Sequence, residues 1–130
     1  MIVRGTTPYH SFLIPLAKED ITMIYITYLQ NGEVVLDKSI DDIDIEDLFA
    51  DDTDEIVSGC KATLHLTQED TLKFKFYPAE EKNVAMIQTR ILTSDGEAHA
   101  SDIILERIYG VLKDEVITEN ESENKNDVEL

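Results

Sequence analysis

Apolar and polar residues alternate along most of this chain, and a period of two predicts half-buried β-strands. The alternation is clearest in the runs 60–67 and 71–77, where every second residue is Cys, Ala, Leu or Phe and the residues between are largely polar. Further strands are predicted over 9–16, 21–29, 33–39, 84–92 and 98–108.

Two of these strands carry signals of their place in a sheet. Pro8 directly precedes the first strand, and Pro15 lies near its end. Because proline cannot donate a hydrogen bond to a ladder, this strand is predicted to lie at an edge. The strand 21–29 is apolar or β-branched on both faces, which favours a central position.

Three short segments predict turns. Asn31-Gly32 separates two strands and predicts a type I′ turn, because that turn needs positive φ at both central residues. Asp95-Gly96 predicts a second hairpin. The polar stretch 67–70 predicts a tight turn or a single helical turn, with the Thr67 hydroxyl as its cap.

About seven strands joined by hairpin turns, without helical crossovers, predict an all-β fold, an antiparallel β-sandwich of immunoglobulin-like type. The chain has no Trp and one Cys, so it lacks the Cys, Trp and Cys core of true immunoglobulin domains. We expect one domain over 1–117 with an acidic loop insertion over 41–58. A disordered acidic C-terminal tail is expected over 118–130.

Acidic residues outnumber basic ones by 28 to 11, and the net charge of −17 is concentrated in two segments. Residues 41–55 hold nine acids and no base, and residues 114–130 hold seven acids and one base. The remaining twelve acids and ten bases leave a nearly neutral body. This charge balance excludes nucleic-acid binding through a basic surface. An anionic membrane surface also repels a chain with this net charge.

The acidic stretch also contains Ile43, Ile45, Leu48 and Phe49, so it is not purely a solvated coil. A short helix over 45–50 is one interpretation. Clustered carboxylates can bind Ca²⁺, but an EF-hand starting at Asp42 places Asp47 at the glycine position and Thr53 at the twelfth. An irregular Ca²⁺ loop is the alternative to a solvated loop. Its candidate ligands are Asp42, Asp44, Glu46, Asp51, Asp52 and Asp54.

No pattern of residues indicates catalysis or a bound cofactor. His10, His65 and His99 lie on different predicted strands without the spacing of a zinc site. Cys60 alternates with Ala62 into the predicted core, where a free Cys behaves as a small hydrophobe. Nucleophile elbows, phosphate-binding glycine loops and His-Glu-x-x-His are absent from the sequence. We therefore expect no enzyme activity, no cofactor and no small-molecule substrate.

The sequence shows no export or membrane signal. Gly5, Pro8 and Pro15 interrupt the N-terminal apolar residues, and no apolar run approaches the ~20 residues that span a bilayer. The expectation is a protein made in the cytoplasm.

Several motifs resemble small proteins of prophages and tailed phages of gut Firmicutes. The opening Arg4-Gly5-Thr6-Thr7-Pro8, followed by His10, Phe12 and Pro15, resembles their "RGTTP" opening. Further similar segments are 26–36, 66–72, 88–98, 100–104 and 111–116. In plan the chain is also similar to the N-terminal sandwich of phage baseplate upper proteins. It departs from them in the length and charge of the acidic stretch.

The resemblance implies a virion structural or assembly protein, associated with the tail or baseplate and acting by protein–protein contact. It implies other phage structural proteins, or copies of this chain, as partners. The protein would be made in the host bacterial cytoplasm and then enter the virion. The segment 104–116 has apolar residues near helical spacing, so we expect a strand end followed by a helical turn or arm. That arm docks on its own sandwich or on a partner through Ile108, Val111, Leu112 and Val116.

Two other functions fit parts of the sequence. The net charge of −17 suits a DNA mimic that inhibits a host nucleic-acid-binding protein. That role calls for carboxylates on a rigid face, whereas here they lie in one loop and one tail. A Ca²⁺-stabilised adhesion or carbohydrate-binding module is the other alternative.

Overall fold

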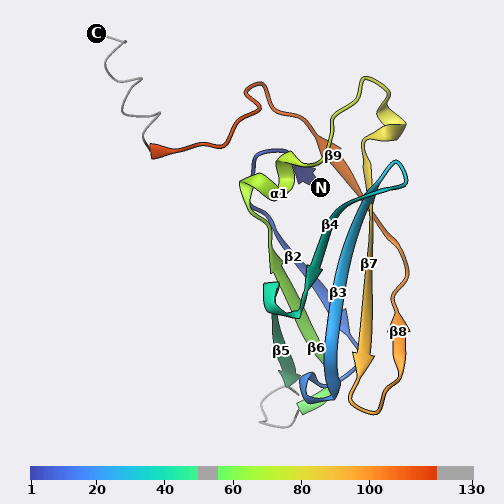
Figure 1. Cartoon of the computed structure of the whole chain (residues 1–130). Coiled ribbons are helices and arrows are strands. Elements are labelled where there is room, and N and C mark those ends of the chain that lie inside the picture. Colours follow the sequence, from blue (N-terminus) through green and yellow to red (C-terminus); the bar gives the residue numbers. More distant parts are fainter. Residues whose placement is uncertain (50–55, 120–130) are drawn as a thin grey trace.

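The structure, a computed structural model, describes residues 1–49 and 56–119 and consists mostly of β-strands in two sheets (Figure 1). The larger sheet has the order β1 (Ile2–Val3), β9 (Ile104–Tyr109), β7 (Val84–Thr93), β3 (Ile21–Gln30) and β4 (Glu33–Ser39), with β8 (Ala98–Ala100) also paired to β7. The smaller sheet has the order β2 (Tyr9–Ile14), β6 (Ile56–His65) and β5 (Ile43–Phe49). All neighbours are antiparallel except β1 and β9.

Short helical segments connect some of the strands. They are η1 (Lys18–Asp20), η2 (Ile40–Asp42), α1 (Gln68–Leu72) and η3 (Glu80–Lys82). No helix in the described part of the chain is long and apolar enough to cross a membrane.

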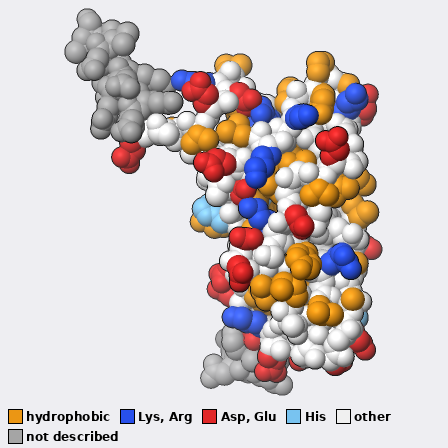
Figure 2. Space-filling view, in the orientation of Figure 1, with side chains coloured by type: hydrophobic (Ala, Val, Ile, Leu, Met, Phe, Trp, Pro, Cys, Tyr) orange, Lys and Arg blue, Asp and Glu red, His pale blue; other side chains and the backbone are white. Residues whose placement is uncertain are grey.

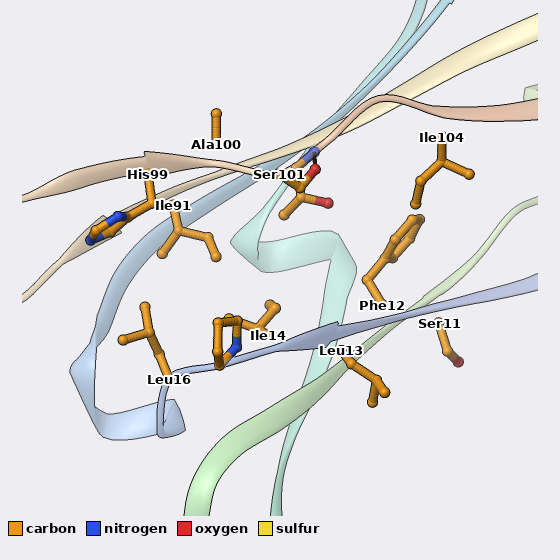
Figure 3. A pocket seen from close by; sticks show the side chains of 12 residues that line it. Ser11, Phe12, Leu13, Ile14, Leu16, Ile91, His99, Ala100, Ser101 and Ile104 are labelled. Carbon is orange, nitrogen blue, oxygen red and sulfur yellow. Dashed lines mark hydrogen bonds between the residues drawn. The ribbon is translucent and has the colours of Figure 1, made fainter.

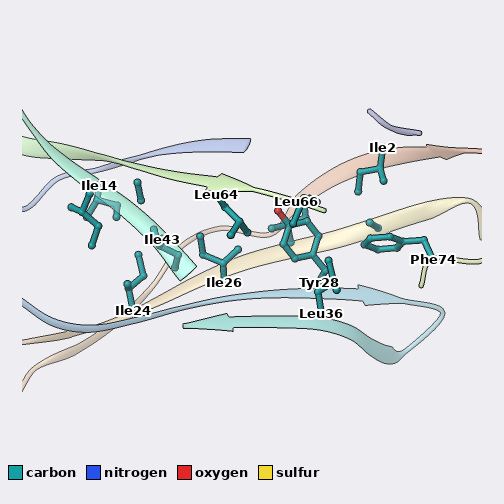
Figure 4. Packing of buried hydrophobic residues seen from close by; sticks show 14 of the residues in the cluster. Ile2, Ile14, Ile24, Ile26, Tyr28, Leu36, Ile43, Leu64, Leu66 and Phe74 are labelled. Carbon is teal, nitrogen blue, oxygen red and sulfur yellow. The ribbon is translucent and has the colours of Figure 1, made fainter. Parts of the chain in front are cut away.

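The hydrophobic core lies between the two sheets (Figure 4). Ile24, Ile26 and Tyr28 of β3 face it from the larger sheet, and Ala62 and Leu64 of β6 face it from the smaller one. Alternate residues of each strand point inward, which is why the period-two pattern marks these strands. The predicted β-sandwich is thus confirmed at the level of two packed sheets.

Several sequence predictions are confirmed in detail. β2 lies at an edge and β3 lies between β7 and β4. Asn31 and Gly32 have φ of 52° and 80°, as a type I′ turn requires. The hydroxyl of Thr67 accepts a hydrogen bond from the Asp70 N–H at the start of α1. Gly96, with φ of 88°, closes the second hairpin, between β7 and β8.

The strand predicted over 71–77 is wrong. The cap at Thr67 starts α1, which takes residues up to Leu72. Beyond it, the side-chain amide of Gln30 binds both backbone groups of Lys75 at 2.7 and 2.8 Å, and the amide of Asn83 binds both of Tyr77. These side chains take the place of a neighbouring strand, so the backbone of 73–77 joins neither sheet.

The helix considered for 45–50 is also wrong where the structure describes it. Ile43 and Ile45 are buried, Asp44 and Glu46 are exposed, and the segment is strand β5. An alternation in which the outward residues are all acids is still a strand pattern, because only the inward face must be apolar. Much of the predicted loop insertion 41–58 is therefore strand; residues 50–55 lie outside the described ones.

The last predicted strand, 98–108, is divided into β8 and β9. Arg90 of β7 pairs with Ala100, whereas Ile87 pairs with Ile104, so one extra residue interrupts the ladder, as in a β-bulge. After β9, residues 110–118 form no helical turn and continue as an arm, which is the other form predicted for this segment. Only residues 118 and 119 of the predicted tail fall within the described part.

Candidate functional site

An apolar groove opens along one edge of the sandwich, between β2 of the smaller sheet and β7, β8 and β9 of the larger one (Figure 3). Its volume is about 550 Å³, within the range of ~300–1,000 Å³ found for binding sites. The lining consists of residues 11–16 and 99–101, together with Thr89, Ile91 and Ile104.

One wall of the groove is the inward face of β2. Phe12, Ile14 and Leu16 point toward the larger sheet, whereas Ser11 and Leu13 point away from it (Figure 3). This division follows from the period of two along a strand. The inward side chains reach the core, because Ile14 belongs to it and Phe12 packs against it.

The opposite wall is formed where β8 and β9 separate. The backbone N–H of Ser101 donates to the Thr89 carbonyl at 2.8 Å, but the Thr89 N–H donates to the Ser101 hydroxyl at 3.0 Å. A side-chain oxygen thus replaces the backbone partner at the bulge. The side chains of Ala98, Ala100 and Ser101 are small, so this wall projects little into the groove. Further along the chain, Ile104 faces Phe12 across the groove (Figure 3).

The lining contains no Asp, Glu, Lys or Arg, although 30% of the chain is charged. Its one titratable side chain is His99, which is exposed and lies 3.4 Å from the Glu97 carboxylate. A surface of this kind binds apolar side chains rather than an ion, since a charge placed there loses water without gaining a partner.

Thr89 is the one lining residue with an unmet polar group. Its side-chain hydroxyl is buried and has no hydrogen-bond partner among the described residues, while the residue as a whole is 3% exposed. A buried hydroxyl without a partner is unfavourable. Because this hydroxyl is buried, it adds no polar position to the exposed surface of the groove.

The predicted Ca²⁺ ligands are not brought together in the described part. Asp44 and Glu46 lie exposed on β5, and Asp42 accepts a hydrogen bond from the Ser39 N–H at 3.2 Å. Asp51, Asp52 and Asp54 lie outside the described residues. Among residues 1–49 and 56–119, no cluster of three or more His, Cys, Asp or Glu is placed to hold a metal ion.

The predicted interface residues separate into different environments. Ile108 is 1% exposed and belongs to the core of its own domain, so it is not on a free surface. Val116 is half-buried, whereas Val111 and Leu112 are exposed. The amide of Gln68 binds both backbone groups of Ile117, so this arm contacts its own sandwich.

Cys60 and His65 lie on opposite faces of β6, and Cys60 belongs to the core, as its alternation with Ala62 predicts. His65 is exposed on β6, where its ring stacks on Tyr9 at 3.9 Å between centroids. Cys60 is buried, and burial, with a smaller effect of the Asp47 carboxylate, raises the pKa of its thiol. A thiol held protonated in this way is a poor nucleophile.

The groove was not predicted from the sequence. Two signals in the sequence mark its walls: an uncharged run over residues 5–17, and the small residues 98, 100 and 101 in the last predicted strand. Neither signal shows that the two segments face each other, because they belong to different sheets.

Comparison with models of protein families, with curated proteins and with solved structures found no match to this chain. The groove and the residues that form it are therefore the basis for proposing a function.

Proposed function

We propose that this chain is a structural or assembly protein without catalytic activity, and that it acts by protein–protein contact at the groove. One observation carries the proposal: an edge strand with one unpaired side borders an apolar, uncharged groove of about 550 Å³. Edge strands and apolar grooves are two of the recurring ways in which proteins bind peptide segments.

Within this class, the proposed role is that of a virion component associated with a phage tail or baseplate. Its basis is the resemblance of the Arg4–Pro8 opening and of the later motifs to small phage proteins. The proposed partners are other phage structural proteins, met in the host cytoplasm during assembly and retained in the virion.

We also propose that the sandwich is of immunoglobulin-like type. In that topology one sheet contains strands B, E and D, and the other contains G, F, C and C′. The orders β2-β6-β5 and β9-β7-β3-β4 support this assignment, strand for strand in chain order. On this assignment β2 is strand B, and its outer side is the place that strand A would occupy.

The test uses the purified proteins encoded by the genes adjacent to that of this chain. Each is mixed with the chain, and complex formation is measured by mass photometry. Ile104→Asp places a charge in the groove, while Leu105→Asp places the same charge on the next residue, which is exposed on the opposite face of β9. Both variants are checked for an unchanged fold by circular dichroism.

We expect a complex with at least one neighbour that Ile104→Asp abolishes and Leu105→Asp leaves intact. If none of these proteins binds, or if the complex survives Ile104→Asp, the proposed function is wrong. Loss of the complex with Leu105→Asp alone would instead place the contact on the outer face of the larger sheet.

A further inference from the structure

We propose that the groove binds an extended segment of another protein, which adds to the smaller sheet as a fourth strand beside β2. This inference rests on the proposed function, because it specifies how the contact at the groove is made. It is carried by the backbone geometry of β2, the shape of the groove and the charge along its rim.

The free side of β2 offers backbone groups in a regular order. The Leu66 N–H donates to the Pro8 carbonyl at 3.0 Å, so these two residues form a hydrogen-bonded pair of the antiparallel ladder. Such pairs alternate with non-hydrogen-bonded ones. Tyr9, Ser11 and Leu13 are therefore in non-hydrogen-bonded pairs with β6, and their N–H and C=O groups face away from it.

Side-chain contacts agree with this assignment. Across non-hydrogen-bonded pairs the side chains lie closer together. The rings of Tyr9 and His65 stack at 3.9 Å, and the hydroxyls of Ser11 and Thr63 lie 3.2 Å apart. Leu13, in the third pair, is 76% exposed.

The edge is open over a defined length. Proteins usually blunt an edge strand with charged side chains, prolines or bulges. Here the prolines lie at positions 8 and 15, outside the strand, and residues 5–17 include no Asp, Glu, Lys or Arg. The six residues of β2 span roughly 20 Å, which leaves an unprotected edge of that length.

A strand added to this edge would fill the groove with its inward side chains. Alternate side chains of a strand are roughly 7 Å apart, so about three of them would enter a groove along an edge of this length. They would meet Phe12 and Ile14 on one side and Ile91 and Ile104 on the other.

The charge around the groove favours a different protein over a second copy. Residues 90–107, which include β8 and its side of the groove rim, hold four acids and two bases, Arg90 and Arg107, and so carry a net charge of −2. A second copy brings the same rim and a net charge of −17, and like charges across an interface are unfavourable. The complementary occupant is a strand with alternate apolar residues and a Lys- or Arg-rich flank.

The probe is a synthetic peptide of two lysines followed by three Thr-Val pairs, added to the isotope-labelled full chain. We expect it to slow hydrogen exchange at the amides of Tyr9, Ser11 and Leu13, whose N–H groups face away from β6. A peptide with two glutamates in place of the lysines should bind about tenfold more weakly.

Two matched pairs test strand pairing itself. Ser11→Pro removes an N–H from the free side without removing a backbone bond to β6, whereas Ser11→Ala keeps that N–H. Both variants lose the hydroxyl contact with Thr63, and only the first should abolish binding. If the Ser11→Pro variant does not fold, two N-methylated versions of the peptide are the second matched pair. In one version of the peptide the Val amides are N-methylated, and in the other the Thr amides are. Only one of the two versions should lose binding, because alternate amides of the added strand face β2.

The inference is wrong if Ser11→Pro and Ser11→Ala bind the peptide equally or, where Ser11→Pro does not fold, if the two N-methylated peptides bind equally. It is also wrong if the peptide leaves hydrogen exchange at the amides of Tyr9, Ser11 and Leu13 unchanged. A groove-dependent complex with a neighbouring gene product would then still support the proposed function. Sedimentation equilibrium of the chain alone tests whether a second copy occupies the groove. If the chain forms a dimer that Ser11→Pro dissociates, the occupant is a second copy and not a strand of another protein.

Discussion

His10 and Tyr28 form a polar contact between the two sheets, next to the apolar groove. Nδ1 of His10 lies 2.6 Å from the Tyr28 hydroxyl oxygen, and Nε2 is buried without a hydrogen-bond partner in the described part of the chain. Burial lowers the pKa of His10, although the nearby Glu106 carboxylate opposes this, and burial raises the pKa of Tyr28. A second proton on this imidazole is therefore unfavourable in the folded state.

This contact makes stability depend on pH. The folded pKa of His10 lies below the ordinary value of 6.5, so below pH 6.5 the unfolded chain binds more protons than the folded one. The free energy of unfolding should fall as the pH decreases from about 7.5 to about 5.5. In urea titrations His10→Gln should reduce this dependence, and His65→Gln, on the exposed face of β6, should retain it. A profile that His10→Gln leaves unchanged would contradict the assignment.

At the scale of elements, the start of α1 shows how a few polar residues redirect the chain. Asp70 is buried, accepts a hydrogen bond from the Thr67 N–H at 3.0 Å and forms an ion pair with Lys38 at 3.0 Å. Burial alone would raise the pKa of Asp70, but these hydrogen bonds outweigh it and lower the pKa. The capping box thus links α1 to β4 of the larger sheet.

Replacing Asp70 should destabilise the fold. Asp70→Ala is expected to reduce the free energy of unfolding by about 2 kcal/mol, because it removes the cap and leaves Lys38 without its partner. Because the folded pKa is lowered, the contribution is present above the unfolded pKa of about 3.9 and is lost as the pH falls through the folded value. Urea unfolding at pH 7 measures it. Glu69→Ala, at an exposed position in the same turn, is the control and should cost less than about 0.5 kcal/mol; equal losses would exclude the buried pair as the cause.

At the scale of the whole molecule, the net charge of −17 opposes compaction. Acidic, basic and apolar side chains are interspersed on the face of the sandwich seen in Figure 2. The largest excess of acids lies in residues 41–55 and 114–130. Repulsion of this kind is screened by salt, because the Debye length falls from roughly 20–30 Å in dilute buffer to a few ångströms at high salt.

The melting temperature should therefore rise with salt, by about 4 °C or more between roughly 20 mM and 500 mM NaCl. Differential scanning calorimetry measures the rise. CaCl₂ at matched ionic strength is the comparison, because pure screening gives a similar rise with either salt. A clearly larger rise with Ca²⁺ would instead indicate an ion bound by the acidic residues of the chain, and a melting temperature independent of NaCl would contradict the repulsion.

Local residue patterns were enough to predict most of the strands, the Asn31-Gly32 turn, the cap at Thr67 and the edge position of β2, because each depends on residues close together in the chain. Strand β5 was not predicted, because the acids on its outer face are also typical of a solvated loop. The fate of 73–77 depended on Gln30, which is 45 residues from Lys75 and supplies the hydrogen bonds that a neighbouring strand would otherwise give. The groove likewise depends on the packing of the edge strand β2 of the smaller sheet opposite β7, β8 and β9 of the larger one. Contacts between distant segments decided these features, and no local pattern of residues specifies them.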